Sequence, residues 1–330
     1  MGKLNACDTC TNSHATERLP MAQNMSKIVY ILSDNRSGST LLDQLLGAHP
    51  KIVSLGEVHH LVAYARQDRS LYNPVHSLDC SCGLPVTTCP FWSKTASRLG
   101  RPLETLQLQL RFLRKGSDRN ASLQRLLKRV LRKVPQLMRY RQVSRFYGGD
   151  QVGADSFALF DAITDVTAAD WLVDSSKSAF RFRALYDFAP RRVYALHLVR
   201  DYRGTVYSKM KRGQSMDVAA GEWVARIQQA NHLTLGVPES QVKRVRYEDL
   251  CLEPGRELRR ICGFLGLEFK DSMMTRPSLH VHHLGGSPSK FDPTRKSVSL
   301  DQSYLHFFAD VDIERMRKIV GTLAADWGYE

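Results

Sequence analysis

The sequence predicts an α/β protein built around a three-layer parallel sheet. Two observations indicate this class: short apolar runs with the length of buried strands recur along the chain, and segments with helical periodicity lie between them. Strands that alternate with helices form parallel pairs, because each helix returns the chain to the starting edge of the sheet. Ligands of such sheets bind at the carboxyl ends of the strands, so the loops that follow the strands are the first places to search for a site.

The first strand, predicted over 28–32, ends in the polar loop 33–40, and leucines at helical spacing follow it. Such a loop points several backbone N–H groups at one spot, where the helix dipole also favours an anion. Side-chain donors add to this, and a glycine lets the backbone approach the ligand. We therefore predict a site for a phosphate-like dianion. Its candidate binding residues are Arg36, Ser37, Gly38, Ser39, Thr40 and Leu41.

The second strand, over 51–54, leads into a segment with one carboxylate and two imidazoles, at Glu57, His59 and His60. A loop with these groups, soon after an anion-binding loop, is a natural place for a general acid or base. The alternative is a surface turn that opens a helix. The segment alone does not decide between the two.

Three of the seven cysteines cluster at Cys80, Cys82 and Cys89, with His76 and Asp79 nearby. A zinc site is one interpretation of such a cluster. However, C-x-C-x6-C is not one of the usual spacings of structural zinc sites, and it supplies no fourth ligand. We therefore favour a buried loop with free thiols.

The region 98–147 is strongly basic. Between Arg111 and Arg145 there are twelve Arg or Lys residues and one acid, and apolar residues recur at helical spacing over 123–134. These features predict an amphipathic basic helix. It is either a solvated face over the core or a surface for an acidic substrate or carrier protein. Nucleic acid fits less well, because no aromatic residues are interleaved with the charges. As part of an insertion over about 60–150, the helix would cover the acceptor side of the site.

The third strand, over 171–174, ends next to Lys177, which would face the ligand edge of a parallel sheet. It is a candidate for stabilising negative charge, and an exposed lysine at a helix start is the alternative. The fourth strand, over 192–199, runs directly into Arg200, and Ser208 follows eight residues later in a helix. These two side chains can hold a second phosphate from opposite sides.

A fifth strand over 241–246 completes the predicted sheet. The late segment 280–296 is rich in turn formers and cations, and its Lys290 can close over a phosphate as part of a flap. Further helices are predicted over 217–235, 254–266 and 311–326.

Bulk composition places few limits on function. The net charge of +14 suggests acidic ligands or surfaces. No apolar stretch approaches the length of a membrane span, and residues 1–25 lack the apolar core of a signal peptide or an anchor. We expect a disordered tail over 1–25, a single domain over 26–330 and a cytoplasmic location, which the odd number of cysteines also suits.

Four motifs together resemble the sulfotransferases that use 3′-phosphoadenosine 5′-phosphosulfate (PAPS). R-S-G-S-T-L at 36–41 resembles their 5′-phosphosulfate loop, and L-V-R-D-Y-R-G-T-V-Y-S at 198–208 looks like their 3′-phosphate motif. V-R-Y-E-D-L at 245–250 and G-G-S-P-S-K-F at 285–291 are similar to two further family segments. The resemblance covers residues 27–327 and rests on the order and spacing of the motifs.

The resemblance implies a P-loop NTPase-like fold, PAPS as co-substrate, adenosine 3′,5′-bisphosphate as product, and no metal requirement. Residues 36–41 would hold the 5′ end of the nucleotide, and Arg200 and Ser208 the 3′-phosphate. Further nucleotide contacts are expected from Tyr247, Gly286, Ser287 and Lys290. The acceptor would be a hydroxyl or amine of a small molecule or natural product.

The resemblance also implies catalytic roles. Arg36, with Lys177 second, would stabilise charge on the transferred group, as in phosphoryl transfer. Glu57 would take the acceptor proton, as a glutamate does in the tyrosylprotein and related bacterial sulfotransferases. Because the hormone and phenol sulfotransferases use a histidine, His59 and His60 remain alternatives.

Two other functions stay open at the level of sequence. An ATP-dependent small-molecule kinase would have a similar fold, but Ser39 stands where the Walker lysine belongs. It would also have no use for the Arg200–Ser208 pair. A nucleic-acid or acidic-partner binding protein acting through 111–145 would leave the anion loop unexplained.

Overall fold

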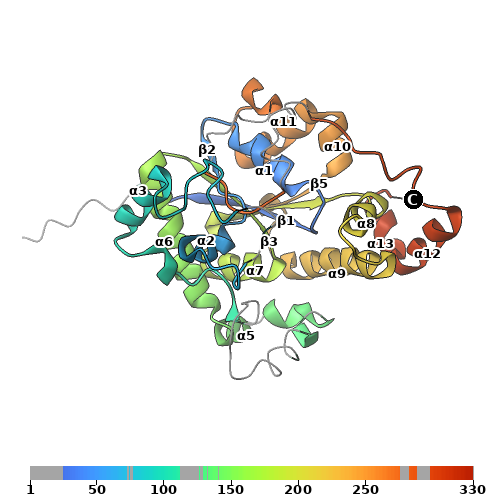
Figure 1. Ribbon diagram of the computed structural model, residues 1–330, viewed down its shortest axis with the longest axis horizontal. Helices are drawn as coiled ribbons and strands as arrows, with labels where there is room; N and C mark the ends of the chain where they lie inside the picture. Colours follow the sequence, from blue (N-terminus) through green and yellow to red (C-terminus); the bar gives the residue numbers. More distant parts are fainter. Residues whose placement is uncertain are drawn as a thin grey trace, which may run out of the picture.

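A computed structural model describes residues 25–329, with gaps at 73, 75–76, 112–125, 127–128, 132, 140, 276–281 and 288–297. Its centre is a five-stranded sheet with the order β2-β3-β1-β4-β5, and every pairing is parallel (Figure 1). The predicted fold class is therefore confirmed, as are all five predicted strands. Their bounds are β1 Lys27–Ser33, β2 Ile52–Ser54, β3 Trp171–Lys177, β4 Val193–Val199 and β5 Val242–Arg246.

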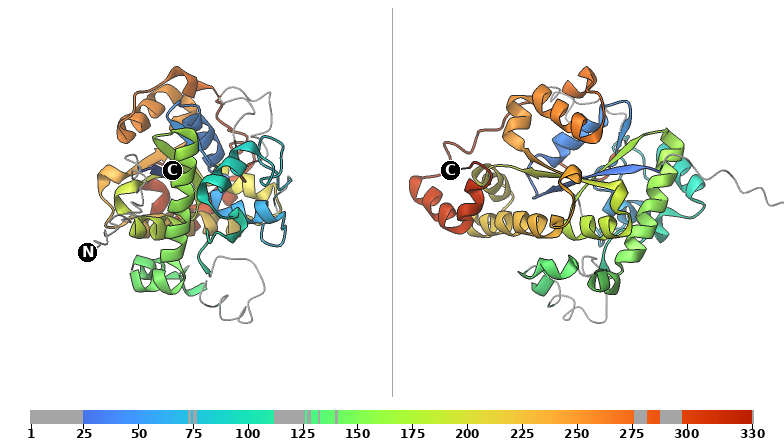
Figure 2. Two further views of the ribbon diagram at one scale, coloured as in Figure 1. Left: turned by 90° about the vertical axis from the view of Figure 1, so that its left-hand side faces the viewer. Right: turned by 180° about the vertical axis from the view of Figure 1, so that it is seen from behind.

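Helices cover both faces of the sheet (Figures 1 and 2). On one face lie α1 (Ser39–Gly47), α10 (Tyr247–Leu252) and α11 (Pro254–Leu265). On the other lie α6 (Gly149–Thr167), α7 (Ala179–Phe188) and α9 (Met216–Thr234), with α2 (Leu61–Arg66) and α3 (Pro90–Leu99) beside them. At the β5 end of the sheet, α8 (Tyr202–Met210), α12 (Asp310–Val320) and α13 (Thr322–Ala325) pack on α9. Short 3-10 turns occupy Val58–His60, Leu103–Thr105, Pro135–Arg139, Pro190–Arg192, Glu239–Gln241 and Asp271–Met274.

The strand β1 explains why the sheet has two covered faces. After Lys27 it is buried throughout, and its side chains alternate between the two main apolar clusters. Tyr30 belongs to the cluster under α6 and α7, whereas Ile31 belongs to the cluster under α1 and α11. A strand buried on both faces reads as a continuous apolar run, and this is the pattern from which it was predicted.

The predicted helices near the sheet are confirmed, and two predictions are corrected. The last helix is interrupted at Gly321, where φ is +55°, so it forms α12 and α13. The basic stretch 111–145 is not one helix: a 3-10 turn starts at Pro135, and α5 spans Arg141–Phe146. Proline at that position removes an N–H donor and clashes with the preceding turn, so the periodicity is not continued. Most of the stretch lies outside the described residues. Among the described helices, none combines the length and apolar character that a membrane crossing needs.

A buried carboxylate, that of Asp43, ties α1 to the sheet. It accepts hydrogen bonds from the hydroxyl of Ser54 at the end of β2 and, at 3.0 Å, from the hydroxyl of Ser175 in β3. Burial raises the pKa of Asp43 to about 7, and the two hydroxyls offset only part of this effect. Asp43 therefore fixes α1 against two strand ends at an electrostatic cost that depends on pH.

We predict that Asp43→Asn changes the pH dependence of stability. The carboxyl loses its proton near pH 3.8 when the chain is unfolded but near pH 7 when it is folded. Stability is therefore lost between these values as pH rises, by about 1.4 kcal/mol per pH unit at most, and this loss levels off above about pH 7. Urea unfolding from about pH 5 to about pH 8 measures this effect. The free energy of unfolding of Asp43→Asn should rise relative to that of the unaltered protein up to pH 7, and the difference should then stay constant. The exposed control Asp271→Asn should show a constant difference. If the stability of Asp43→Asn and that of the unaltered protein changed in parallel with pH, the raised pKa of Asp43 would be contradicted.

Candidate active site

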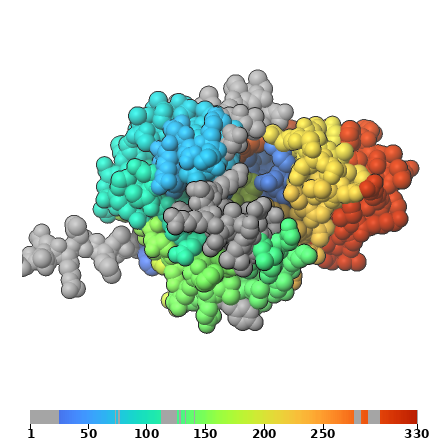
Figure 3. Space-filling model, turned by 60° about the horizontal axis from the view of Figure 1, so that its bottom comes forward, coloured from blue at the N-terminus to red at the C-terminus, as the bar shows by residue number. Residues whose placement is uncertain are grey.

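The predicted site residues gather in one open pocket of about 1380 Å³ at the carboxyl edge of the sheet. In Figure 3 the hollow lies between the cyan and yellow parts of the surface, and the blue N-terminal part of the chain is visible at its bottom. This location follows from the topology, because all five strands are parallel and their following loops meet at one edge. The predicted residues that line the pocket are Arg36, Gly38, Ser39, Thr40, Leu41, Glu57, His59, His60, Lys177, Arg200, Ser208, Tyr247, Gly286 and Ser287.

Two predicted binding residues do not line the described pocket. Ser37 is 1% exposed and turns into the protein, where its Oγ has no hydrogen-bond partner among the described residues. The Ser37 side chain does not line the described pocket, and its contact with a ligand stays a prediction. Lys290 lies outside the described residues.

The loop between β1 and α1 has a conformation that only particular residues tolerate. Gly38 has φ +89°, and a Cβ built on it would lie 2.3 Å from Cδ2 of Tyr247. Arg36 also has a positive φ, +72°, which is uncommon for a residue with a side chain and costs energy. The loop therefore adopts a strained backbone conformation when it presents its donors, and Tyr247 packs directly against it.

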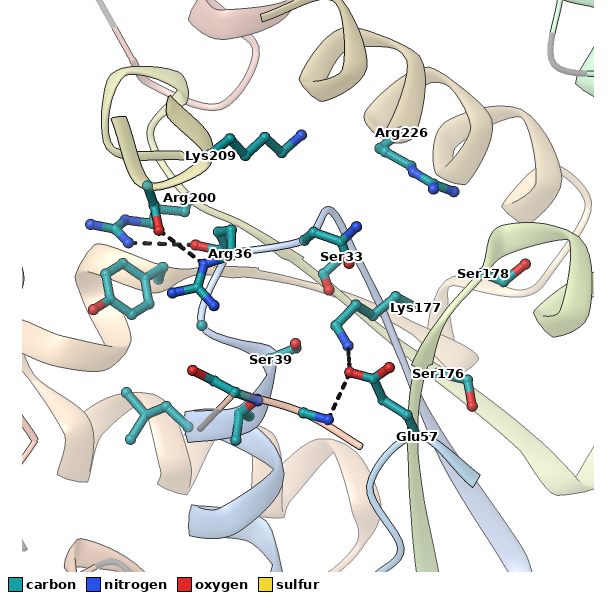
Figure 4. A pocket seen from close by; sticks show the side chains of 18 of the residues that line it. Ser33, Arg36, Ser39, Glu57, Ser176, Lys177, Ser178, Arg200, Lys209 and Arg226 are labelled. Atoms are coloured by element: carbon teal, nitrogen blue, oxygen red, sulfur yellow. Dashed lines mark hydrogen bonds and ion pairs between the residues drawn. The ribbon is translucent and has the colours of Figure 1, made fainter. Parts of the chain in front are cut away.

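The two predicted anion sites touch one another. The Arg36 Nε donates to the Ser208 Oγ at 2.9 Å, and the Arg200 Nη1 donates to the Arg36 carbonyl oxygen at 3.4 Å (Figure 4). The guanidinium of Arg200 stacks 4.7 Å from the centre of the Tyr247 ring. Burial, together with Arg212 and Arg200, lowers the pKa of Arg36. Crowded cations of this kind are stabilised by an anion between them.

Arg200 has one partner that the sequence did not reveal. Its Nη2 donates to the carbonyl oxygen of Asp301 at 3.0 Å and contacts the Asp301 carboxylate at 3.3 Å. Its Nε is buried and has no hydrogen-bond partner among the described residues. A buried, unmatched guanidinium donor beside a pocket is the feature that a phosphate oxygen would satisfy.

Additional cations line the pocket. Lys209 donates to the Asp34 carboxylate at 2.6 Å, which joins α8 to the first loop. Lys211 and Arg212, which follow α8, and Arg226 of α9 also line the pocket, and Figure 4 labels Lys209 and Arg226. Sequence analysis missed these residues, although Lys209, Lys211 and Arg212 come directly after Ser208 and form a run that could have been noted.

Glu57 and Lys177 point toward each other and form an ion pair (Figure 4). The Gly286 N–H donates to the Glu57 Oε1 at 3.1 Å, and the His60 Nε2 lies 3.5 Å from the other carboxylate oxygen. Burial alone would raise the pKa of Glu57, but Lys177 and His60 together hold it well below its usual value. Glu57 is therefore a carboxylate at neutral pH and able to accept a proton. Lys177 has φ +67°, so a second cation of the site occupies a strained position.

The two histidines beside Glu57 differ in setting. The rings of His59 and His60 lie 3.7 Å apart, and the His60 ring stacks on Tyr72 with a centre separation of 3.5 Å. Burial, and then His60, lower the pKa of His59 well below its ordinary value, so this ring is neutral at neutral pH. The ligand atoms of Glu57, His59 and His60 lie within 4.8 Å of one another. A metal ion there would meet the Lys177 ammonium already paired with Glu57, which disfavours a metal site at this position.

The segment 282–287 reaches the pocket as predicted. Leu284 extends the pairing of the loop after β2, because its carbonyl oxygen accepts from the Glu57 N–H at 2.7 Å. The Ser287 N–H donates to the Thr40 Oγ1 at 3.1 Å. The segment therefore bridges the first loop and the segment that carries Glu57.

The parallel α/β fold carries a cation-lined pocket at its carboxyl edge, and the comparison with known proteins gives the family of the chain. The family model described as "Sulfotransferase family" matches residues 94–271, more than half of the chain. The chain therefore belongs to the sulfotransferase family, which confirms the resemblance drawn from its motifs. No curated protein shows a significant match.

Two solved structures share the fold. The sulfotransferase domain from the curacin biosynthetic pathway is 20% identical, with a TM-score of 0.53 over 93% of this chain and 99% of that one. The sulfotransferase domain from the Synechococcus PCC 7002 olefin synthase is 21% identical, with a TM-score of 0.51 over 92% of this chain and 97% of that one.

We predict that Gly38→Ala is more destabilising than Gly213→Ala. Both glycines have positive φ, +89° and +86°, but a Cβ at Gly213 meets nothing within 4 Å, whereas one at Gly38 runs into Tyr247. The left-handed backbone should lower the free energy of unfolding of each variant by about 1–2 kcal/mol. The clash should lower that of Gly38→Ala by about 1–3 kcal/mol more. Urea unfolding measures both values.

A double-mutant cycle tests the cause. In a Tyr247→Ala background the extra cost of Gly38→Ala should vanish, because the ring that the methyl group meets is gone. An equal cost in both backgrounds would show that the contact with Tyr247 is not what requires glycine.

Proposed function

We propose that this chain transfers a sulfuryl group from PAPS to a hydroxyl or amine of a small-molecule acceptor. The observation that carries the proposal is the contact between the two predicted anion sites, in which Arg36 donates to Ser208 and its carbonyl oxygen accepts from Arg200. A donor with a 5′-phosphosulfate and a 3′-phosphate needs two cationic sites held at a fixed distance. ATP, which lacks a 3′-phosphate, would leave the second site unused.

The 5′ end of the donor would bind the backbone N–H groups of the first loop at the start of α1, with Ser39, Thr40 and Arg36 as further donors. The 3′-phosphate would bind Arg200 and Ser208. At Arg200 it would replace the carboxylate of Asp301, whose side chain is 44% exposed and whose other oxygen accepts hydrogen bonds from Ser303. Arg212 and Lys211 add positive potential at the same end.

The acceptor would lie on the Glu57 side of the pocket. Leu71, Tyr72 and Gln109, from the segment between β2 and α6, line the pocket there beside His60. This supports our proposal that residues 60–150 form an acceptor-side insertion within a single domain over 26–330. An acidic substrate or a carrier protein docking on the basic stretch 111–145 is a further proposal from its charge.

The proposed reaction is an in-line displacement at sulfur. The acceptor oxygen or nitrogen forms a bond to sulfur, the bond between sulfur and the bridging phosphate oxygen breaks, and the acceptor proton moves to the Glu57 carboxylate. Adenosine 3′,5′-bisphosphate leaves with the bonding electron pair. Arg36 and Lys177 would stabilise the charge that grows on the bridging and sulfuryl oxygens. The five free cysteines among the described residues agree with our proposal of a cytoplasmic location.

We predict that Arg200→Ala weakens the binding of adenosine 3′,5′-bisphosphate but not that of adenosine 5′-phosphate. Charge-assisted hydrogen bonds are worth about 1.5–3 kcal/mol, so the affinity should fall by about 10- to 150-fold. Calorimetry with both ligands, and with ATP, measures this. Arg203→Ala is the matched control, because Arg203 pairs with Asp201 and does not line the pocket.

Two results would contradict the proposal. One is equal or tighter binding of ATP by the unaltered protein, which would favour a kinase. The other is an equal loss for both adenosine ligands in Arg200→Ala, which would place Arg200 away from the 3′-phosphate.

We predict that Glu57→Gln lowers kcat by about 10²- to 10⁴-fold and leaves the affinity for adenosine 3′,5′-bisphosphate within about threefold. Glutamine keeps an oxygen for the Gly286 N–H but cannot take the acceptor proton. The measurement is sulfuryl transfer to a panel of small alcohols and amines, with His59→Asn and His60→Asn in parallel. If a histidine variant lost that activity while Glu57→Gln kept it, the base would be the histidine.

A further inference from the structure

Three thiols and one imidazole meet outside the active site. Cys80 and Cys82 lie before α3, Cys89 directly precedes it, and His282 comes from the late segment, some 200 residues further along the chain. The ligand atoms of these four side chains all lie within 4.8 Å of one another. We call them the thiol–imidazole cluster. They supply the fourth group that the cysteine spacing alone did not provide.

The distances in the cluster match the edges of a zinc tetrahedron. The His282 Nδ1 lies 3.2 Å from the Cys89 Sγ and 3.6 Å from the Cys80 Sγ, and the Sγ atoms of Cys82 and Cys89 are 3.6 Å apart. Zinc bonds of about 2.3 Å to sulfur and about 2.0 Å to nitrogen give tetrahedral edges of about 3.7 Å between sulfurs and about 3.5 Å between sulfur and nitrogen. Three of the six separations in the cluster therefore match the edges of a zinc site, and the remaining three lie within 4.8 Å.

Backbone N–H groups contact two of the sulfurs in the cluster. The N–H of Cys82 is hydrogen-bonded to the Cys80 sulfur, and the N–H groups of Phe91 and Trp92 are hydrogen-bonded to the Cys89 sulfur at the start of α3. Burial raises the pKa of both thiols, and these donors would stabilise the sulfurs as thiolates once a cation is bound. The His282 ring stacks on Phe91 at 4.8 Å with an angle of 3° between the planes, which fixes the direction of its Nδ1.

We propose that the thiol–imidazole cluster binds one structural zinc ion. Three thiolates and one imidazole form a closed tetrahedral set of the Cys₃His type, without an open position for a substrate. Cys82 and His282 are partly exposed, so an ion can enter from solvent, whereas Cys80 and Cys89 are buried. The Cys82–Cys89 sulfur separation of 3.6 Å is far from the roughly 2.05 Å of a disulfide, which also favours shared metal ligation.

The zinc ion would hold the late segment against the active site. Next to His282, the His283 N–H donates to the Ser81 Oγ at 2.8 Å, so the two segments already run side by side. Gly286, four residues after His282, donates to the Glu57 carboxylate, and Ser287 donates to Thr40. Zinc coordination by His282 would therefore fix the position of the backbone N–H donors that orient Glu57. This makes the cluster a positioning device and not part of the catalytic machinery.

The test uses the full-length chain, purified under reducing conditions from zinc-supplemented medium. Elemental analysis by mass spectrometry should find about one zinc ion per chain, with Cys89→Ser and His282→Ala each reduced to less than about a tenth of that. His282→Cys should retain zinc, because it restores a tetrahedral ligand set. Cys262→Ala should also retain it, since this buried thiol packs on Met273 away from the cluster.

A second measurement does not depend on folding of the variants. Zinc is removed from the unaltered protein with a chelator, and the reduced apoprotein is titrated with Co²⁺. A stoichiometric rise of intense visible bands and of sulfur-to-cobalt charge-transfer absorption indicates tetrahedral thiolate ligation. Chelation should also lower Tm and speed amide hydrogen exchange in 282–287, and zinc should restore both.

Three outcomes would overturn the proposal. They are no zinc in the purified protein together with no Co²⁺ uptake by the reduced apoprotein, a Cys82–Cys89 disulfide found in fresh lysate by thiol trapping, or iron in place of zinc. None of these readouts depends on sulfuryl transfer. A failure of the zinc proposal is therefore distinguishable from a failure of the proposed function.

Discussion

The hydrogen bond from Arg36 to Ser208 is the contact on which the architecture of the site depends. It is possible because β1 and β4 are neighbours in the sheet, so the loop after β1 and the start of α8 leave the sheet side by side. Residues 172 positions apart in the chain then lie 2.9 Å apart. The backbone at Arg36, whose side chain makes this contact, is left-handed, with φ +72°. The order of the strands thus brings the two predicted anion sites together, and the strained Arg36 provides one side of the contact between them.

Several cations of the pocket have carboxylate partners, and burial separates two kinds of pair. Asp34 and Lys209 are almost fully buried, at 2% and 4% exposure, so their pair is a structural link that an entering anion cannot easily replace. Asp301 is 44% exposed and pairs with Arg200 at the pocket rim, so little burial is lost when it turns away. Under the proposed function, the rim pair exchanges its carboxylate for phosphate, while the buried pair keeps α8 in place during that exchange.

Local sequence patterns predicted much of this fold, but they could not predict contacts between residues far apart in the chain. The five strands and the residues directly after them could be read from apolar runs, because a parallel sheet places those residues at one edge. Asp301 and His282 could not, since nothing in their own neighbourhood shows that they approach Arg200 and Cys89. The basic stretch 111–145 was predicted as one helix, but a 3-10 turn starts at Pro135, after the residues whose periodicity indicated the helix.

The pairing of Glu57 with Lys177 links donor binding to proton transfer under the proposed function. A carboxylate whose pKa is held well below its usual value is a weak base, so in the resting pocket Glu57 has little tendency to take a proton. Lys177 is its main source of stabilisation, and the same ammonium is a candidate partner for the bridging oxygen of the donor. As Lys177 shifts toward negative charge on that oxygen, burial becomes the dominant influence on Glu57 and its proton affinity rises. The proton affinity of Glu57 would therefore rise as negative charge develops on the leaving group. Lys177 would in this way couple proton transfer to the departure of the leaving group.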